Sequence, residues 1–96
     1  MNRLGFRYDN LNRTVPDVLT RPWLEIDAVY THFATADDYT HPLFDLQRTR
    51  FEDALRCLDG LGVHPRLRHA ANSAALLRDR NSWFEAVRPG LLLYGV

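Results

Sequence analysis

The stretch RLRHAANSAALLR, from Arg66 to Arg78, contains the junction that decides the fold. Its first part, Arg66–Ala70, has the length of a short strand. Its second part, Asn72–Arg78, favours a helix, and either Asn72 or Ser73 can cap it, since both side chains can accept a hydrogen bond from a free backbone N–H. A strand that passes into a helix within two residues is typical of a βα unit.

A second strand and helix precede this junction. Leu24–Phe33 starts with alternating apolar and polar residues and contains β-branched and aromatic side chains, which predicts a strand. Leu43–Asp59 repeats its apolar residues at helical spacing, so we expect an amphipathic helix that stops at Gly60. Arg48 falls on the apolar side of that helix and must extend to solvent or find a partner. Alternating strands and helices predict an α/β fold with a parallel sheet.

The two ends of the chain extend this pattern. Thr14–Leu19 is expected to form a short helix, capped by its first residue, with Pro16 in the first turn. Val87–Val96 is expected to form a further strand, opened by the turn at Pro89 and Gly90.

Composition limits the classes of protein to which the chain can belong. Its 96 residues suffice for one small domain at most, and 46% hydrophobic with 25% charged residues is ordinary for a globular protein. The net charge of zero gives no reason to expect nucleic acid or a membrane surface as a partner. There is neither an apolar run long enough to span a bilayer nor a signal peptide, and the single Cys57 fits a reducing compartment, so we expect a cytoplasmic protein.

Most polar residues follow the expected strands, where ligands of parallel sheets usually bind, whereas Arg88–Gly90 leads into the last expected strand. Ser73 opens a helix among small alanines and suits a phosphate, although a plain helix cap packed on the sheet explains the same residues. Arg88 precedes a rigid Pro-Gly turn and could present a fixed cation, or could be an ordinary surface arginine.

Two further residues are weaker candidates. His32 follows a strand and could hydrogen-bond to a partner or transfer protons, although a lone histidine is usually structural. Arg3 precedes a turn at Gly5, where an arginine is normally solvated. The four histidines and Cys57 show no metal-ligand spacing, so no metal is expected.

Five segments taken together resemble the alanine racemases, which use pyridoxal 5'-phosphate to interconvert L- and D-alanine. The segments are MNRLGF, THFATAD, QRTRFEDAL, HAANSAALL and VRPGLLLYG, in that order and with similar spacing. The resemblance implies a (β/α)8 TIM barrel with the cofactor at the carboxyl ends of its strands, a separate C-terminal β domain, and a homodimer. Because such a barrel needs about 250 residues, we expect residues 1–96 to be a partial barrel, its middle-to-late βα units, without the β domain.

The resemblance also implies a role for each cofactor-binding residue. Asn72 and Ser73 match the family's Asn-Ser pair, with Ser73 on the cofactor phosphate. The backbone amides of Gly90 and Leu91 match two further phosphate donors. Arg88 matches the arginine that faces the pyridine nitrogen. His32 matches a histidine hydrogen-bonded to that arginine, and Arg3 matches an arginine near the phenolic oxygen of the cofactor.

Two family residues have no counterpart. All twelve cationic side chains are arginine, so the lysine that carries the cofactor is missing, as is the tyrosine supplied by the partner subunit. The resemblance thus implies a piece of an enzyme that makes D-alanine for the peptidoglycan cell wall, with no catalytic residue of its own and inactive alone. The alternatives are a non-catalytic remnant or interaction module, and a racemase of different amino-acid specificity.

Overall fold

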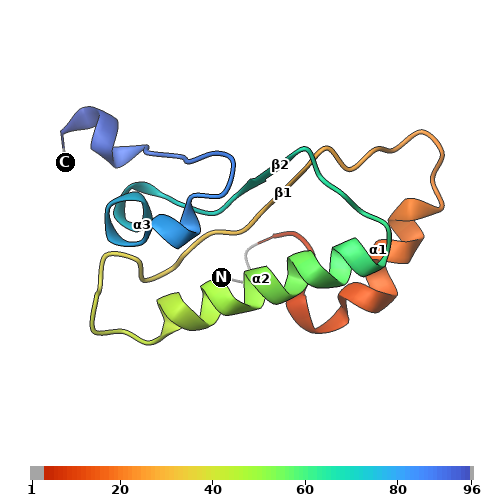
Figure 1. Ribbon diagram of the computed structural model, residues 1–96, viewed down its shortest axis with the longest axis horizontal. Coiled ribbons are helices and arrows are strands. Elements are labelled where there is room, and N and C mark those ends of the chain that lie inside the picture. The colour runs from red at the N-terminus through yellow and green to blue at the C-terminus, as the bar shows by residue number, and fades with distance from the viewer. Residues whose placement is uncertain (1–3, 96) are drawn as a thin grey trace.

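Two parallel strands joined by a long helix form the centre of the computed structural model, which describes residues 4–95 (Figure 1). The helices are α1 (Leu11–Leu19), α2 (Leu43–Gly60) and α3 (Ser73–Arg78), and the strands are β1 (Ala28–Tyr30) and β2 (Leu67–His69). The short 3-10 turns are η1 (Tyr8–Asn10), η2 (Arg80–Ser82) and η3 (Leu91–Tyr94). The molecule extends 43 Å along its longest axis, with α1 and η3 toward opposite ends (Figure 1).

The strands pair as the sequence predicts, over a shorter length. Ala28 lies opposite Leu67, and Tyr30 lies opposite His69. The N–H of Thr31 adds one hydrogen bond to the carbonyl of His69, at 3.3 Å. Parallel strands need a crossover between them, and α2 provides it. The expected βαβα order and parallel sheet are therefore confirmed, although the first strand covers three residues and not the ten of 24–33.

Helix α2 agrees with its predicted range to within one residue because its periodicity extends over several turns. Phe44, Phe51 and Leu58 are 6% exposed or less and lie on the face that meets the sheet. The helix lies along one side of the two strands (Figure 1). Val29, the middle residue of β1, packs against both buried clusters beneath this helix. Side chains alternate along a strand, so Ala28 and Tyr30 face away from α2.

Arg48, on the side of α2 that carries the apolar residues, forms two ion pairs. Its guanidinium lies 3.3 Å from the carboxylate of Glu52, one turn further along α2, and 3.2 Å from that of Asp79. The ion pair with Asp79 ties α2 to the segment that follows α3.

The alanines of HAANSAA mostly belong to the core. Ala70, Ala71 and Ala75 are fully buried and pack in one cluster with Phe33 and Phe44. Small side chains let the end of β2 and the start of α3 approach these rings closely. Packing thus explains three of the four alanines without a ligand.

The predicted strand over 87–96 is wrong within the described residues. Leu91–Tyr94 forms a 3-10 turn, and its Leu91, Leu93 and Tyr94 are 65–83% exposed. A run of three leucines does not alternate and leucine also favours helices, so its periodicity does not favour a strand over a helix. Strand pairing occurs instead slightly earlier, where Ala86 forms a parallel bridge with His69.

The first helix begins earlier than expected, at Leu11, and continues the 3-10 turn η1. Thr14 is therefore inside the helix and does not cap it; its hydroxyl donates to the carbonyl of Asn10, at 3.1 Å. Pro16 is in the interior of the helix and removes one backbone hydrogen bond there. Across the described residues, none of the helices combines the length and apolarity needed to cross a membrane.

Candidate functional site

Three of the predicted polar segments meet at the carboxyl ends of β1 and β2. Parallel pairing places the residues after Tyr30 beside those after His69. The third segment joins them because the N–H of Arg88 donates to the carbonyl of Ala71, at 2.8 Å. The structure therefore brings residues that are up to 57 positions apart in sequence to the same end of the sheet.

Arg88 connects the two strand ends directly. Its Nη2 donates to the carbonyl of Thr31, at 2.6 Å, and to that of Ala70, at 3.2 Å. Its Nε is buried and has no acceptor among the described residues, so the guanidinium keeps an unused N–H donor. Arg88 is thus a half-buried cation anchored through its Nη2 and not a solvated surface arginine.

His69 belongs to this site, although the sequence did not single it out. Its ring stacks on that of Tyr30, with 5.0 Å between centroids and 4° between planes. The guanidinium of Arg88 lies 5.3 Å from the centroid of the same tyrosine ring. Burial, and then the charge of Arg88, lower the pKa of His69 below its usual value of 6.5, which favours the neutral imidazole at pH 7.

A signal for His69 was present in the sequence. It ends the strand that immediately precedes the Asn-Ser pair, just as His32 follows the other strand. His32 is half-buried two residues beyond β1, and its contact with Arg88 stays a prediction. Arg3 lies outside the described residues.

Asn72 is the residue that caps α3, of the two that the sequence offered. Its Oδ1 accepts from the N–H of Ala75, at 3.0 Å. Its Nδ2 donates to the carbonyl of Phe33, at 3.2 Å. One side chain therefore begins the helix and also holds the segment after β1 against it.

Ser73 connects α3 to the turn after Arg88. Its hydroxyl oxygen accepts from the N–H of Leu92, at 2.9 Å, which leaves the hydroxyl proton available for another acceptor. The N–H of Gly90 donates to the carbonyl of Arg88, at 2.9 Å, so this amide is used inside the turn. Ser73 and Leu91 line one cavity, whereas the Gly90 amide is used within its own turn, so the predicted phosphate site of Ser73, Gly90 and Leu91 stays a prediction.

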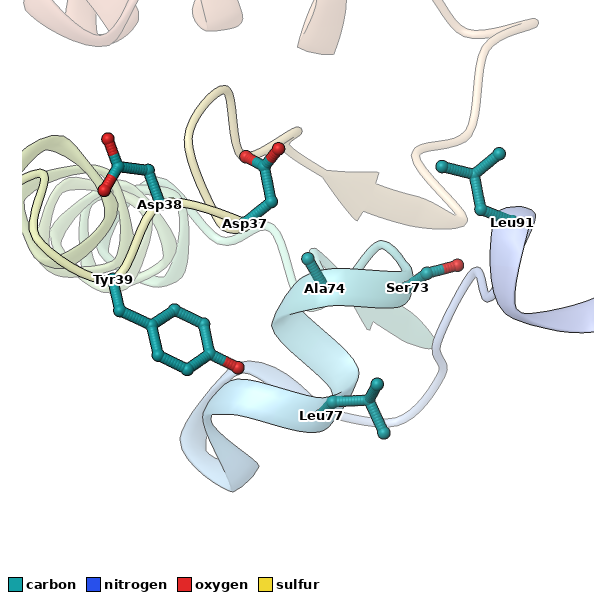
Figure 2. A pocket seen from close by; sticks show the side chains of 7 residues that line it. All are labelled: Asp37, Asp38, Tyr39, Ser73, Ala74, Leu77 and Leu91. Atoms are coloured by element: carbon teal, nitrogen blue, oxygen red, sulfur yellow. The ribbon is translucent and has the colours of Figure 1, made fainter. Parts of the chain in front are cut away.

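A shallow cavity of about 600 Å³ opens beside Ser73. Figure 2 shows its lining: Asp37, Asp38, Tyr39, Ser73, Ala74, Leu77 and Leu91. Ser73 and Leu91 form one end, and neither carboxylate points at Ser73 (Figure 2). Hydrogen bonds from Thr40 lower the pKa of Asp38 and keep it charged. An anion would therefore be favoured at the Ser73 end and disfavoured at the opposite one.

Consecutive βα units with polar residues gathered at the carboxyl ends of parallel strands define an α/β protein with its candidate site at that end of the sheet, as in TIM barrels. The family profile described as "Alanine racemase, N-terminal domain" matches residues 1–96. The chain belongs to this family, and the partial TIM barrel predicted from the sequence is confirmed.

Individual relatives agree with this assignment. The chain is 43% identical over 95 residues to an alanine racemase of Carboxydothermus hydrogenoformans, covering 99% of this chain and 26% of that protein. The crystal structure of alanine racemase from Bacillus anthracis with bound L-Ala-P superposes with a TM-score of 0.90 at 42% identity, over 100% of this chain and 25% of that one. The crystal structure of alanine racemase from Bartonella henselae with covalently bound pyridoxal phosphate gives a TM-score of 0.73 at 27% identity, over 100% of this chain and 25% of that one. The chain thus spans about a quarter of the length of its relatives.

Proposed function

We propose that this chain carries the pyridine and phosphate contacts of a pyridoxal-phosphate-dependent alanine racemase, an isomerase that interconverts L- and D-alanine. The observation that supports this most strongly is Arg88, a cation anchored across two strand ends whose buried Nε–H has no acceptor among the described residues. Membership of the family makes pyridoxal 5'-phosphate the natural ligand for such a site. Alanine as substrate, a homodimer and a cytoplasmic location belong to the same proposal.

Arg88 would donate to the pyridine nitrogen of the cofactor. An arginine stays protonated at any physiological pH, so it can donate this hydrogen bond and is a poor acid toward the ring. When bound, pyridoxal phosphate withdraws electrons from the substrate Cα. By donating a hydrogen bond without protonating the ring, Arg88 would limit this electron withdrawal and favour the return of a proton to Cα before side reactions occur. His32 would hold Arg88 in place, and Arg3 would lie near the phenolic oxygen.

Ser73 would donate its free hydroxyl proton to the cofactor phosphate. Leu91 lines the same cavity, and its backbone amide would donate to the same phosphate. The Gly90 amide would contribute only after leaving the carbonyl of Arg88, which requires a small rotation of the turn. Asn72 would set the position of Ser73 through its two hydrogen bonds.

The chain by itself should bind the cofactor without holding it covalently and should not racemise alanine, since it contains no lysine. We would incubate it with pyridoxal phosphate, measure binding by equilibrium dialysis, reduce with borohydride and map the peptides by mass spectrometry. The expected result is reversible binding that Arg88→Leu weakens, with a reduced adduct only at the N-terminal amine. A stable adduct at an internal side chain would contradict the argument.

The racemase assignment itself needs the rest of the barrel. Residues 1–96 would replace the matching quarter of the Bacillus anthracis enzyme, to which the chain is 42% identical. We expect the chimera to racemise alanine and the same chimera with Arg88→Leu to lose most of that activity. A chimera that folds and binds pyridoxal phosphate but does not racemise alanine would favour the remnant; activity on another amino acid would favour a racemase of different specificity.

A further inference from the structure

Tyr30 occupies an unusual position at the end of β1. Its neighbour Val29 packs into the core beneath α2, whereas Tyr30 faces the other side of the sheet and is 53% exposed. Parallel pairing places it directly opposite His69. Its ring is therefore on the same side of the sheet as the groups that form the site.

One face-to-face contact and one cation contact involve this single ring. The imidazole of His69 is parallel to it within 4° at 5.0 Å, and the guanidinium carbon of Arg88 lies 5.3 Å from its centroid. Contacts of arginine with aromatic faces within about 6 Å are attractive. Tyr30 thus contacts both His69, at the end of β2, and Arg88.

The hydrogen bonds of Arg88 leave a freedom that this ring can remove. Both bonds to strand-end carbonyls start from the same atom, Nη2. Two bonds from one nitrogen fix that nitrogen but allow the planar guanidinium to turn about it. The direction of the unused Nε donor depends on this rotation. A flat surface beside the guanidinium limits the rotation, because arginine stacks preferentially on aromatic faces.

We propose that Tyr30 is a positioning residue: its ring face holds the guanidinium of Arg88 and the imidazole of His69 in fixed orientations, so that Arg88 presents its free donor to the pyridine nitrogen. The last part of this inference rests on the proposed function. The ring face, and not the phenolic hydroxyl, makes both contacts, so phenylalanine should replace tyrosine and an aliphatic residue should not.

The test compares Tyr30→Leu with Tyr30→Phe in the full 96-residue chain. Tyr8→Leu is the matched control, since the ring of Tyr8 is similarly exposed and lies 5.4 Å from the guanidinium of Arg50, on another part of the molecule. The first readout needs no cofactor: the pKa of His69, obtained from the pH dependence of deuterium exchange at its ring C2 position. Peptide mass spectrometry follows this exchange at low protein concentration.

We expect Tyr30→Leu to raise the pKa of His69 by about half a unit or more, since the imidazole loses its cover and Arg88 is free to turn away. Tyr30→Phe and Tyr8→Leu should leave it within about 0.2 unit. In an Arg88→Leu background the effect of Tyr30→Leu should shrink, because the two residues act through one contact. Equal effects of Leu and Phe, or strictly additive effects of Tyr30 and Arg88, would overturn the inference.

The second readout is the affinity for pyridoxal phosphate, measured by equilibrium dialysis. Tyr30→Leu should lower it about two- to fivefold, the equivalent of one aromatic–cation contact, while Tyr30→Phe stays close to the unsubstituted chain. An unchanged affinity in Tyr30→Leu would overturn the link to the cofactor. Failure of the unsubstituted chain to bind pyridoxal phosphate would count against the proposed function, and the pKa of His69 would still decide whether Tyr30 orients Arg88.

Discussion

Arg88 acts on this structure in two ways that one side chain rarely combines. It supplies hydrogen bonds to two backbone carbonyls at the ends of different strands, and it retains a buried donor with no acceptor among the described residues. Buried polar groups normally find a partner, so an unused donor at a strand end is a site where a ligand acceptor would be stabilised. The neutral form of His69, favoured by burial and by Arg88, avoids a second positive charge beside it.

Ser73 offers a prediction at the same scale. Ser73→Ala removes the hydroxyl that accepts from Leu92 and that would donate to the cofactor phosphate. We expect the affinity for pyridoxal phosphate to fall by on the order of 1–3 kcal/mol, as measured by equilibrium dialysis.

Ser82→Ala is the matched control for this substitution. Ser82 is buried and its hydroxyl lies within hydrogen-bonding distance of the carbonyls of Ala75 and Asp79, away from the cavity. Loss of the Ser82 hydroxyl should lower the free energy of unfolding and leave the affinity for pyridoxal phosphate unchanged. Equal losses of affinity in the two variants would mean that Ser73 acts only through folding.

At the scale of elements, Asn72 provides a connection between the two strand ends in addition to that of Arg88. Asn72→Asp keeps an oxygen to cap α3 and loses the donor to the carbonyl of Phe33, whereas Asn72→Ala loses both. We expect Asn72→Ala to lower the free energy of unfolding by about 1–3 kcal/mol, the sum of a lost cap and a lost hydrogen bond. Asn72→Asp should recover the cap part of this loss in urea unfolding. If the two variants were equally unstable, the cap would contribute nothing.

Glu85 attaches the segment after η2 to β2 and gives a pH prediction. Its carboxylate accepts from the backbone N–H of Arg68, at 2.9 Å, and pairs with the guanidinium of the same residue. The hydrogen bond from the Arg68 side chain lowers the pKa of Glu85 below 4.5. A depressed carboxyl pKa stabilises the fold above pH 4.5 and loses this contribution as the pH falls through the lowered value.

We therefore expect Glu85→Gln to lower the free energy of unfolding at pH 7 by no more than about 1 kcal/mol, since the ion pair is partly exposed. Below pH 4.5 the variant should lose less stability than the unsubstituted chain, because it has no carboxylate at this position to protonate. Thermal melts at pH 7, 5 and 3 would measure both effects. The matched control is Asp53→Asn, which removes an exposed ion pair with Arg56 on α2, away from the strands. A melting temperature of Glu85→Gln that falls with acid as steeply as in the unsubstituted chain would contradict the prediction.

The elements also show what the sequence could and could not predict. Helix α2 was predictable because its apolar residues repeat over several turns, and the strand-to-helix junction at Asn72 was predictable from its capping residues. The turn at Leu91–Tyr94 was not, since LLLY fits a strand or a helix equally well by periodicity. The convergence of Asn72 and Ser73 with the residues after β1 follows from strand ends meeting in a parallel sheet, whereas Arg88 joins them through its backbone hydrogen bond to Ala71. The stack of Tyr30 on His69 depends on the register of the strands, which no local pattern encodes.

At the scale of the whole molecule, the described residues cover only one side of the sheet. Helix α2 packs on one face, while parallel sheets are normally covered on both (Figure 1). Large apolar side chains remain exposed at both ends of the long axis: Trp23 and Leu24 near α1, and Leu77, Leu91 and Leu93 near α3 and η3. In a TIM barrel the neighbouring strands and helices would pair with these edges and cover these residues.

This exposure leads us to expect that the 96-residue chain self-associates when studied alone. Unpaired strand edges and exposed apolar side chains are the two features that most readily join identical chains. Light scattering across a concentration series should show a mass that rises above 11.2 kDa. Leu91→Glu with Leu93→Glu should reduce the association if the apolar turn drives it, whereas a charge placed at the already polar Arg80, as Arg80→Glu, should not. A single 11.2 kDa species with a sharp cooperative melt at every concentration would show that the exposed surface is tolerated in water. In that case these βα units would be stable without the rest of a barrel.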